Sequence, residues 1–206
     1  MKKRGMIPMT LGLLLIAAAL GLVLYNQWDA NRAGRASEEV LDVLNEVIVE
    51  RTAEHRQEQE GEEKEEQIHK DQNDMVTVPI DGNDYLGVIE IPSLELSLPV
   101  MADWSYSKLT VAPCRYAGSY YTDDLVLCAH NYRTKHFYPI RWVDIGADVY
   151  FTTVNGTVYH YTVTNREMLR PTEIEKMTVP GDWDLTLFTC SSDGLLRCTV
   201  RCVRAD

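Results

Sequence analysis

The sequence near the C-terminus reads Asp184-Leu-Thr-Leu-Phe-Thr-Cys190-Ser-Ser-Asp-Gly-Leu-Leu-Arg197-Cys-Thr-Val-Arg201. It predicts an apolar strand, a tight turn and a second strand. Cys190 closes the first strand and Arg197 opens the second, so a hairpin would hold the two side chains near one another. A thiol beside a permanent cation is a plausible nucleophile, because the thiolate is the reactive form and positive surroundings favour it. The alternative is a buried structural cysteine beside a surface arginine, and the rest of the chain has to decide between the two.

Several short runs before this hairpin are rich in branched and aromatic residues, which is typical of strands. They are residues 85–91, 96–101, 124–129, 148–154 and 157–163, and the hairpin adds 185–188 and 198–203. Two of the runs flank Asn155-Gly156, the strongest short-range hairpin signal that a sequence offers. One short helix is predicted to open at Pro171, where proline suits the first turn. Many short strands with little helix indicate a compact all-β barrel or sandwich.

The N-terminus carries Lys2, Lys3 and Arg4, followed by an uncharged segment from Met6 to Tyr25. A segment of this length and character can cross the hydrocarbon core as a helix, and we expect a transmembrane anchor over residues 6–28. The competing interpretation is a cleaved signal peptide, since residues 17–19 are Ala-Ala-Ala, but the apolar run continues past them. The basic residues favour a cytoplasmic segment 1–5 and place everything after the anchor outside the cell.

Residues 29–74 are predicted to form an extracellular helical and acidic linker. Within it, residues 37–50 are typical of a short helix, with Ser37 as its N-cap and one apolar face. That face consists of Val40, Leu44, Val47 and Ile48. It can pack on the domain, pair with another chain or lie on the membrane surface, and the sequence does not choose among these. Residues 54–74 are almost wholly polar, with nine acidic and three basic residues, so we expect a spacer there, followed by a folded domain over residues 75–206.

The composition excludes some classes of function. The net charge of −11 argues against a general nucleic-acid binder, which would show a basic patch. The sequence has no metal-ligand spacing and no phosphate-binding loop, so we expect neither a metal nor another cofactor. The five cysteines are an odd number for an extracytoplasmic chain, so at least one thiol should be free or bonded to another molecule. The four besides Cys190 are interpreted as small buried hydrophobic residues.

Three histidines of the domain are candidate partners for Cys190. His130 directly follows the strand 124–129, which places its ring at a strand end. His136 lies in the next loop and ranks second. His160 lies in the middle of a strand, where a structural histidine is the usual case. A histidine near the thiol would supply general acid–base catalysis.

These motifs together resemble those of the sortases, the membrane-anchored cysteine transpeptidases of Gram-positive bacteria. Thr186-Leu-Phe-Thr-Cys190 with the downstream Arg197 resembles the family's T-L-x-T-C signature and its arginine. Leu127-Cys-Ala-His130-Asn131 stands at the position of the family's histidine motif. Tyr85-Leu-Gly-Val-Ile-Glu-Ile-Pro92 with Leu98-Pro-Val100 is similar to its opening strands. One departure is Cys-Ala before His130, where many members carry Ala-Gly; this changes the local packing and keeps the histidine in place.

The resemblance implies a closed eight-stranded sortase-type β-barrel with short connecting helices. It implies that Cys190 attacks a sorting signal of the Leu-Pro-x-Thr-Gly type and that an amine of a cell-wall precursor or a pilin lysine resolves the thioester. His130 would be the general acid and base, and Arg197 would bind the substrate carbonyl or the developing oxyanion. Thr189 is a candidate for substrate contact. The partners would be surface proteins or pilins that carry a sorting signal, and the enzyme would be a single-pass protein of the cell membrane with its catalytic domain outside.

The subclass and two rival functions remain to be weighed. The modest space between residues 168 and 184 disfavours the long extra helix of class B, and no aromatic lid of the class C type precedes Tyr85, so we expect a class D-like sortase, with class B-like second. One rival is another cell-wall cysteine peptidase, but papain-like hydrolases place cysteine before histidine, and the motif of L,D-transpeptidases is missing. The other rival is a catalytically silent, membrane-tethered β-domain that only binds surface proteins. Replacement of Cys190 separates these functions.

Overall fold

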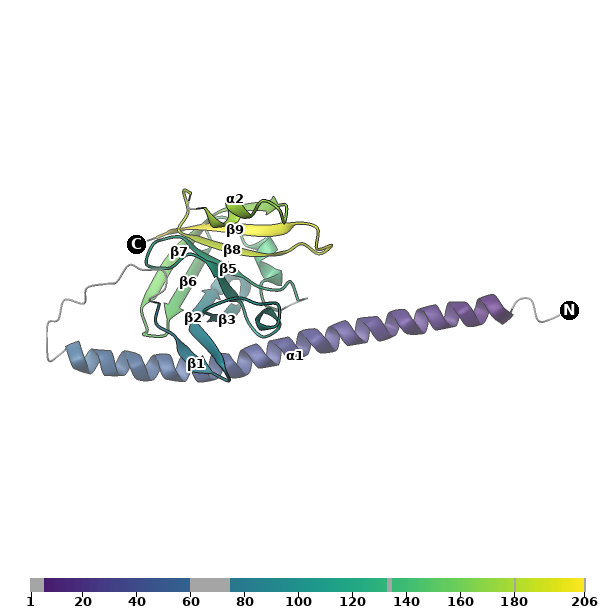
Figure 1. The fold of residues 1–206 in the computed structure, drawn as a ribbon, viewed down its shortest axis with the longest axis horizontal. Coiled ribbons are helices and arrows are strands. Elements are labelled where there is room, and N and C mark those ends of the chain that lie inside the picture. The colour runs from purple at the N-terminus through teal and green to yellow at the C-terminus, as the bar shows by residue number, and fades with distance from the viewer. Residues whose placement is uncertain (1–5, 60–74, 133–134, 180, 206) are drawn as a thin grey trace.

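The computed structural model describes residues 6–59, 75–132, 135–179 and 181–205. One long helix precedes a β-domain (Figure 1). The helices and strands are α1 (Met6–Gln59), β1 (Val78–Ile80), β2 (Asn83–Ile91), β3 (Leu96–Met101), β4 (Cys114–Ala117), β5 (Leu125–Cys128), β6 (Asp148–Thr153), β7 (Val158–Leu169), α2 (Ile174–Thr178), β8 (Leu185–Cys190) and β9 (Arg197–Arg204). Short 3₁₀ helices lie at Pro92–Leu94, Lys108–Thr110 and Tyr138–Trp142.

The strands form one sheet that closes into a barrel. Their order is β1-β2-β3-β4-β5-β8-β9-β7-β6, and antiparallel pairing of β6 with β2, from Gly87↔Thr153 to Glu90↔Tyr150, joins the two ends. Strands β2 to β9 make the eight-stranded barrel, and the three-residue β1 extends it beside the start of β2. The predicted eight-stranded barrel is therefore confirmed.

The barrel has an apolar interior and a second apolar layer outside it, and β5 belongs to both. Leu125 and Leu127 face the interior cluster, whereas Val126 and Cys128 belong to the outer cluster. Side chains alternate between the two faces of a strand, so a strand that is buried on both faces reads as a continuous apolar run. This burial explains the run at residues 124–129 and places the strand end before His130 in a rigid setting.

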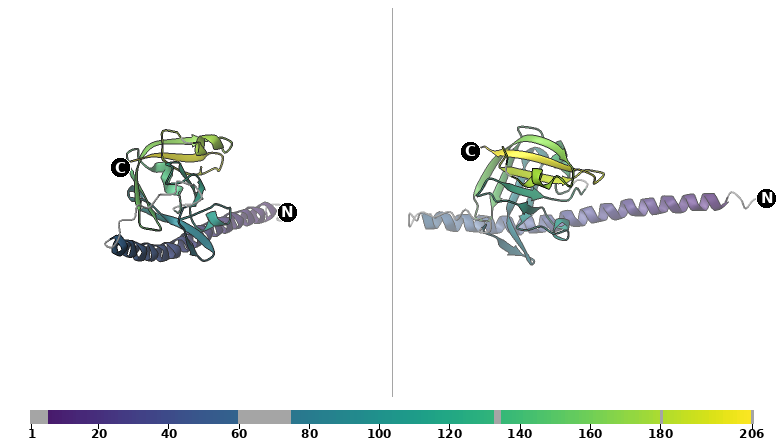
Figure 2. Two further views of the ribbon diagram at one scale, coloured as in Figure 1. Left: turned by 60° about the vertical axis from the view of Figure 1, so that its left-hand side comes forward. Right: turned by 45° about the horizontal axis from the view of Figure 1, so that its top comes forward.

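α1 is a single continuous helix, which corrects the prediction of a separate short helix beginning at Ser37. Ser37 lies within the helix and is buried, so it is not an N-cap. The small and apolar side chains buried along one face recur every three or four residues, at Ala30, Ala33, Ser37, Val40, Leu44 and Ile48. Of the three possibilities for the face, the structure has it packed on the domain, mainly against β3 and β2 (Figure 2).

The far end of this packed half contacts the β6–β7 turn. Arg51 Nη1 donates a hydrogen bond to Asn155 Oδ1 over 3.2 Å. Gly156, with a φ of +83°, approaches α1 so closely that a Cβ atom there would lie 2.0 Å from Thr52 Oγ1. Residues 29–53 thus pack on the barrel and connect it to the segment predicted to be the anchor. The predicted acidic spacer falls outside the described residues from residue 60 to residue 74.

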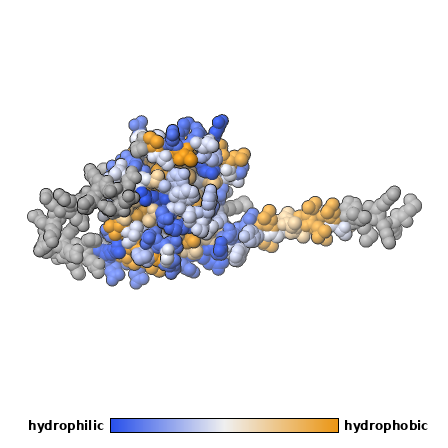
Figure 3. All heavy atoms as spheres, viewed as in Figure 1, coloured by the Kyte–Doolittle hydropathy of each residue, from blue (hydrophilic) through white to orange (hydrophobic). Residues whose placement is uncertain are grey.

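The N-terminal half of α1 projects beyond the barrel and exposes its apolar side chains (Figure 3). Leu14 and Leu24, for example, are 67% and 69% exposed. Among the described residues, this helix is long and apolar enough to cross a membrane. Leucines exposed to this extent around one half of a helix are typical of a lipid-facing surface.

The predicted helix at Pro171 is present, but it begins three residues later, as α2 at Ile174. Residues Pro171 and Thr172 form a turn instead. Met177 of α2 is buried against the outer cluster, and this contact holds the short helix near the end of β8.

Candidate active site

The barrel topology brings Cys190, His130 and Arg197 to the same end of three neighbouring strands. β5 and β8 are parallel, with Cys128 opposite Phe188, so His130 and Cys190 each lie two residues beyond this pair. β8 and β9 are antiparallel, and Cys190 is opposite Arg197. Residues 60 positions apart in the sequence therefore meet, because parallel strands end at the same edge of a sheet.

The three side chains line one pocket with a volume of about 170 Å³, which we call the Cys190 pocket. Its lining residues are Trp104, Tyr106, Leu109, Tyr116, Cys128, Ala129, His130, Pro171, Ile174, Met177, Phe188, Thr189, Cys190 and Arg197. Most of this wall is aromatic or aliphatic, and Trp104, Tyr116 and Phe188 lie ring against ring along it. Such a pocket suits a peptide with apolar side chains that presents a carbonyl to the polar end.

Two hydrogen bonds tie the histidine segment to the cysteine segment. Thr189 Oγ1 donates to the carbonyl of Ala129 over 2.8 Å, and Asn131 Nδ2 donates to the carbonyl of Ser191 over 2.8 Å. They lie on either side of His130 and Cys190, so they fix the spacing of the two segments. The hydroxyl of the buried Thr189 is therefore committed to Ala129, which favours a positioning role over the predicted substrate contact.

Cys190 differs from the other cysteines in its surroundings. It is half-buried, whereas the other four, all within the described residues, are buried, and all five thiols are free. Burial raises the pKa of Cys114 to about 12 and raises the pKa values of Cys128, Cys198 and Cys202 as well. Those four thiols stay protonated and inert at neutral pH, in agreement with the interpretation of them as small buried hydrophobic residues.

His130 is half-buried in the pocket wall. Burial lowers its pKa, and the carboxylate of Asp29 on α1 acts in the opposite direction. Neutral imidazole is the form that accepts a proton, so this environment suits a general base at neutral pH.

Arg197 is half-buried at the mouth of the pocket. Its Nη1 donates to the carbonyls of Gly194 and Leu196 over 3.3 and 3.2 Å. These contacts hold the guanidinium on the β8–β9 loop.

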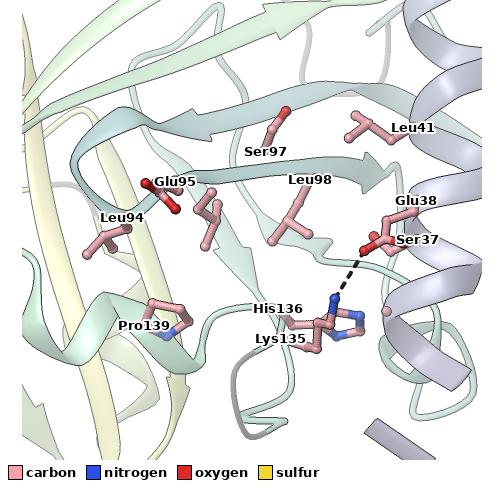
Figure 4. A pocket seen from close by; sticks show the side chains of 12 residues that line it. Ser37, Glu38, Leu41, Leu94, Glu95, Ser97, Leu98, Lys135, His136 and Pro139 are labelled. Carbon is pink, nitrogen blue, oxygen red and sulfur yellow. Dashed lines mark hydrogen bonds and ion pairs between the residues drawn. The ribbon is translucent and has the colours of Figure 1, made fainter. Parts of the chain in front are cut away.

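His136, the second-ranked histidine, lies in a different hollow between α1 and β3 (Figure 4). It is 2% exposed, and neither of its ring nitrogens has a hydrogen-bond partner within the described part of the chain. Burial, with the charge of His130, lowers the pKa of His136 to about 4. The ring of Tyr132 contacts both histidines, with centroid distances of 5.1 Å to His130 and 5.3 Å to His136. The structure thus places His130, and not His136, beside Cys190.

His160 lies on β7, away from the pocket. Its Nε2 is 2.8 Å from Asp148 Oδ1, and its ring stacks on Tyr150. These contacts agree with the structural role expected of it.

One polar residue near the site, Arg141, was not indicated by any sequence motif. Arg141 comes from the 3₁₀ helix Tyr138–Trp142 and reaches the β8–β9 loop. Its Nη2 donates to the carbonyl of Cys190 over 3.3 Å, and Nη1 hydrogen-bonds Ser192 Oγ. Nε donates to the carbonyl of Tyr138 over 3.0 Å, and the guanidinium stacks over that ring. Arg141 therefore fastens the loop that follows the cysteine.

A family model of the sortase domain matches residues 89–205, which is more than half of the chain. The chain belongs to the sortase family. A comparison with curated proteins finds no match. This sortase shares its fold with sortase A from Corynebacterium diphtheriae, at a TM-score of 0.53 and 20% identity over 60% of this chain and 62% of that one. It thus spans less than two thirds of the length of that relative.

Class C enzymes are also among the similar structures. Sortase C1 from Streptococcus suis has a TM-score of 0.52 and 28% identity over 59% of this chain and 73% of that one. Sortase C from Streptococcus pneumoniae has a TM-score of 0.53 and 22% identity over 59% of this chain and 69% of that one. Likeness at this level concerns the fold that sortase classes share, so the class D-like assignment stays a prediction.

Proposed function

We propose that this sortase is a membrane-anchored cysteine transpeptidase with Cys190 as nucleophile, His130 as general acid and base, and Arg197 as carbonyl and oxyanion ligand. The observation that carries the proposal is the single pocket in which these three residues meet. The apolar half of α1 is its anchor, with residues 1–5 in the cytoplasm and the barrel outside the cell. Its substrates are surface proteins or pilins that end in a sorting signal of the Leu-Pro-x-Thr-Gly type.

The chemistry follows from the three side chains. With His130 protonated, the Cys190 thiolate attacks the carbonyl carbon of the threonine, and Arg197 stabilises the negative charge on the carbonyl oxygen. The C–N bond then breaks, and the departing amine takes a proton from His130, which leaves a thioester. An incoming amine attacks the thioester and gives a proton to His130, and the C–S bond breaks to return the thiolate. His130 regains in the second half of the reaction the proton that it gave in the first, and the Cys190 thiolate is regenerated, so the reaction requires no cofactor.

The test uses the full chain in detergent micelles with a peptide that contains Leu-Pro-x-Thr-Gly. We expect the wild type to form a thioester adduct on Cys190, visible by mass spectrometry, and to release the C-terminal fragment. Cys190→Ala should form no adduct and release no fragment. Cleavage by Cys190→Ala would show that the assignment is wrong, and binding without cleavage by the wild type would favour the silent binding domain.

Two histidine variants separate the partners of the thiol. His130→Ala should lose the reaction by a factor of about 100 or more, since general acid–base groups contribute that much. His160→Gln is the matched control, because His160 lies outside the pocket, and it should cleave as the wild type does. Loss of cleavage in His136→Ala together with full activity in His130→Ala would transfer the role to the other histidine.

A further inference from the structure

A second hollow lies on the α1 side of the catalytic residues, and we call it the helix-side groove. It has a volume of about 470 Å³ and is lined by Val23, Asn26, Gln27, Asp29, Ala30, Asn131, Tyr132, Tyr138 and Ser192. Asn131 directly follows His130, and Ser192 lies two residues after Cys190. The groove and the Cys190 pocket are therefore lined by the same two segments, which carry the histidine and the nucleophile, but they have no lining residue in common.

The two hollows differ in chemistry. The Cys190 pocket is mostly aromatic and aliphatic and contains no acidic residue. The helix-side groove is lined mostly by amide, hydroxyl and phenol groups, and Asp29 is the one acid among its lining residues. A peptide with apolar side chains fits the first wall, whereas a polar molecule with a positive charge fits the second.

Asp29 has the contacts expected of a carboxylate that can receive a cation. Its side chain is 24% exposed, and its Oδ1 pairs with Arg32 Nη2 over 3.0 Å, while the Arg32 side chain is 57% exposed. An ion pair this exposed is weak, so an ammonium group that brings further contacts can displace Arg32. Arg141, a second cation near the groove among the described residues, is bound to carbonyl groups and stacked over Tyr138.

Asp29 also connects the groove to the catalytic histidine. Its charge acts on His130. Burial, the charge of Asp29 and a hydrogen bond with its carboxylate raise the pKa of Tyr132, whose ring contacts His130. A cation held by Asp29 would therefore lie on the histidine side of the thioester, where the second half of the reaction needs an amine.

We propose that the helix-side groove binds the acceptor, a molecule with a primary ammonium group that Asp29 attracts and amide groups that Asn26, Gln27 and Asn131 hold. This inference rests on the proposed transpeptidase function. The ammonium loses one proton to water, and its nitrogen then forms the new C–N bond to the thioester carbon. The second proton passes to His130 as the C–S bond breaks and its electron pair returns to the Cys190 sulfur. The helix α1, which contains the predicted anchor, thus supplies five of the nine residues that line the binding site for the second substrate.

The test measures what fraction of the acyl-enzyme reacts with an amine and what fraction reacts with water. The full chain in detergent micelles is acylated with the sorting-signal peptide, and glycinamide or Nα-acetyl-lysine amide competes with water. Asp29→Asn should lower the ratio of transpeptidation to hydrolysis about two- to fivefold, because a partly exposed charge pair is worth roughly that factor. Arg32→Gln should raise the ratio, because it frees the carboxylate. Asp42→Asn, an exposed acid on the same helix, should keep the wild-type ratio.

A purely structural role for Asp29 predicts different changes in the rates of aminolysis and hydrolysis. If Asp29 only positioned His130, aminolysis and hydrolysis would slow together and the ratio would stay constant, which would overturn the proposal. A fall in the ratio with hydroxylamine, which is uncharged at neutral pH, as large as that with glycinamide would also overturn it, because charge would not be the cause. Failure of any sorting-signal peptide to acylate Cys190 would refute the proposed function instead.

Discussion

Arg141 offers a sharp test of how the nucleophile is held in place, through Arg141→Gln. The change removes the hydrogen bonds of the guanidinium to the Cys190 carbonyl and to Ser192, and the stacking over Tyr138. Hydrogen bonds from a charged donor contribute about 1.5–3 kcal/mol each when shielded. Arg141 is half-buried, so we assign roughly 1–1.5 kcal/mol to each of the two loop contacts, or about 2–3 kcal/mol together.

This energy sets the expected loss of rate. If the two contacts hold Cys190 in its reactive position, their loss corresponds to a decrease of about 30- to 150-fold, since 1.4 kcal/mol is a factor of ten. The assay is rapid-quench mass spectrometry of thioester formation, with the melting temperature followed in parallel so that loss of fold is not mistaken for loss of positioning. Arg35→Gln, an exposed arginine on α1, is the control. A folded Arg141→Gln enzyme that acylates within twofold of the wild-type rate would refute the reasoning.

Three further predictions concern stability. The pKa of the buried His136 is about 4 and that of an unfolded histidine is about 6.5, so between these pH values the unfolded state binds one more proton than the folded state. The free energy of unfolding should therefore fall by roughly 3 kcal/mol as the pH drops from 6.5 to 4. His136→Asn should flatten this part of the pH profile, measured by urea titrations. Leu44→Ala should cost about 2–5 kcal/mol, because this side chain is fully buried between α1 and the barrel, and an unchanged denaturation midpoint beside the exposed control Val43→Ala would mean that α1 does not pack there in solution. Gly156→Ala should lower the melting temperature more than Gly82→Ala, since both residues have a positive φ but only the first has α1 within reach of the new Cβ, and equal effects would contradict that contact.

The barrel strands could be predicted where a strand is long or fully buried. The apolar run that forms β5 is buried on both faces, and Asn155-Gly156 indicates the turn between β6 and β7. The three-residue β1 and the four-residue β4 were not predicted. In β4 the register shifts between Arg115 and Ala117, so the alternation that identifies a strand is broken there.

The continuity of α1 could not be predicted for a different reason. The face that packs on the barrel begins with Ala30, Ala33 and Ser37, whose side chains are too small or too polar to show an apolar period. Ser37 is a favourable N-cap in isolation, but tertiary packing overrides that preference and carries the helix through it.

Some residues of the site could be predicted from the sequence and others could not. Cys190, His130 and Arg197 stand at strand ends within motifs, so their meeting in one pocket could be expected from the sequence. Arg141 and Asp29 lie outside those motifs, one in a 3₁₀ helix and the other on α1. Only the three-dimensional contacts bring them to the catalytic segments, so no spacing in the sequence could have indicated them.

If the apolar half of α1 lies in a membrane, the unbroken course of the helix also sets the height of the catalytic site above it. Asp29 follows Tyr25 by four residues, which is about 6 Å along a helix. With the apolar half of α1 embedded as proposed, the site would lie close above the lipid headgroups, and a stiff helix would not let it rise. The enzyme would then diffuse in the plane of the membrane and cleave only sorting signals that lie at that distance from the lipid headgroups. The number of residues between a substrate's membrane segment and its sorting signal would become a criterion of selection, in addition to the signal itself.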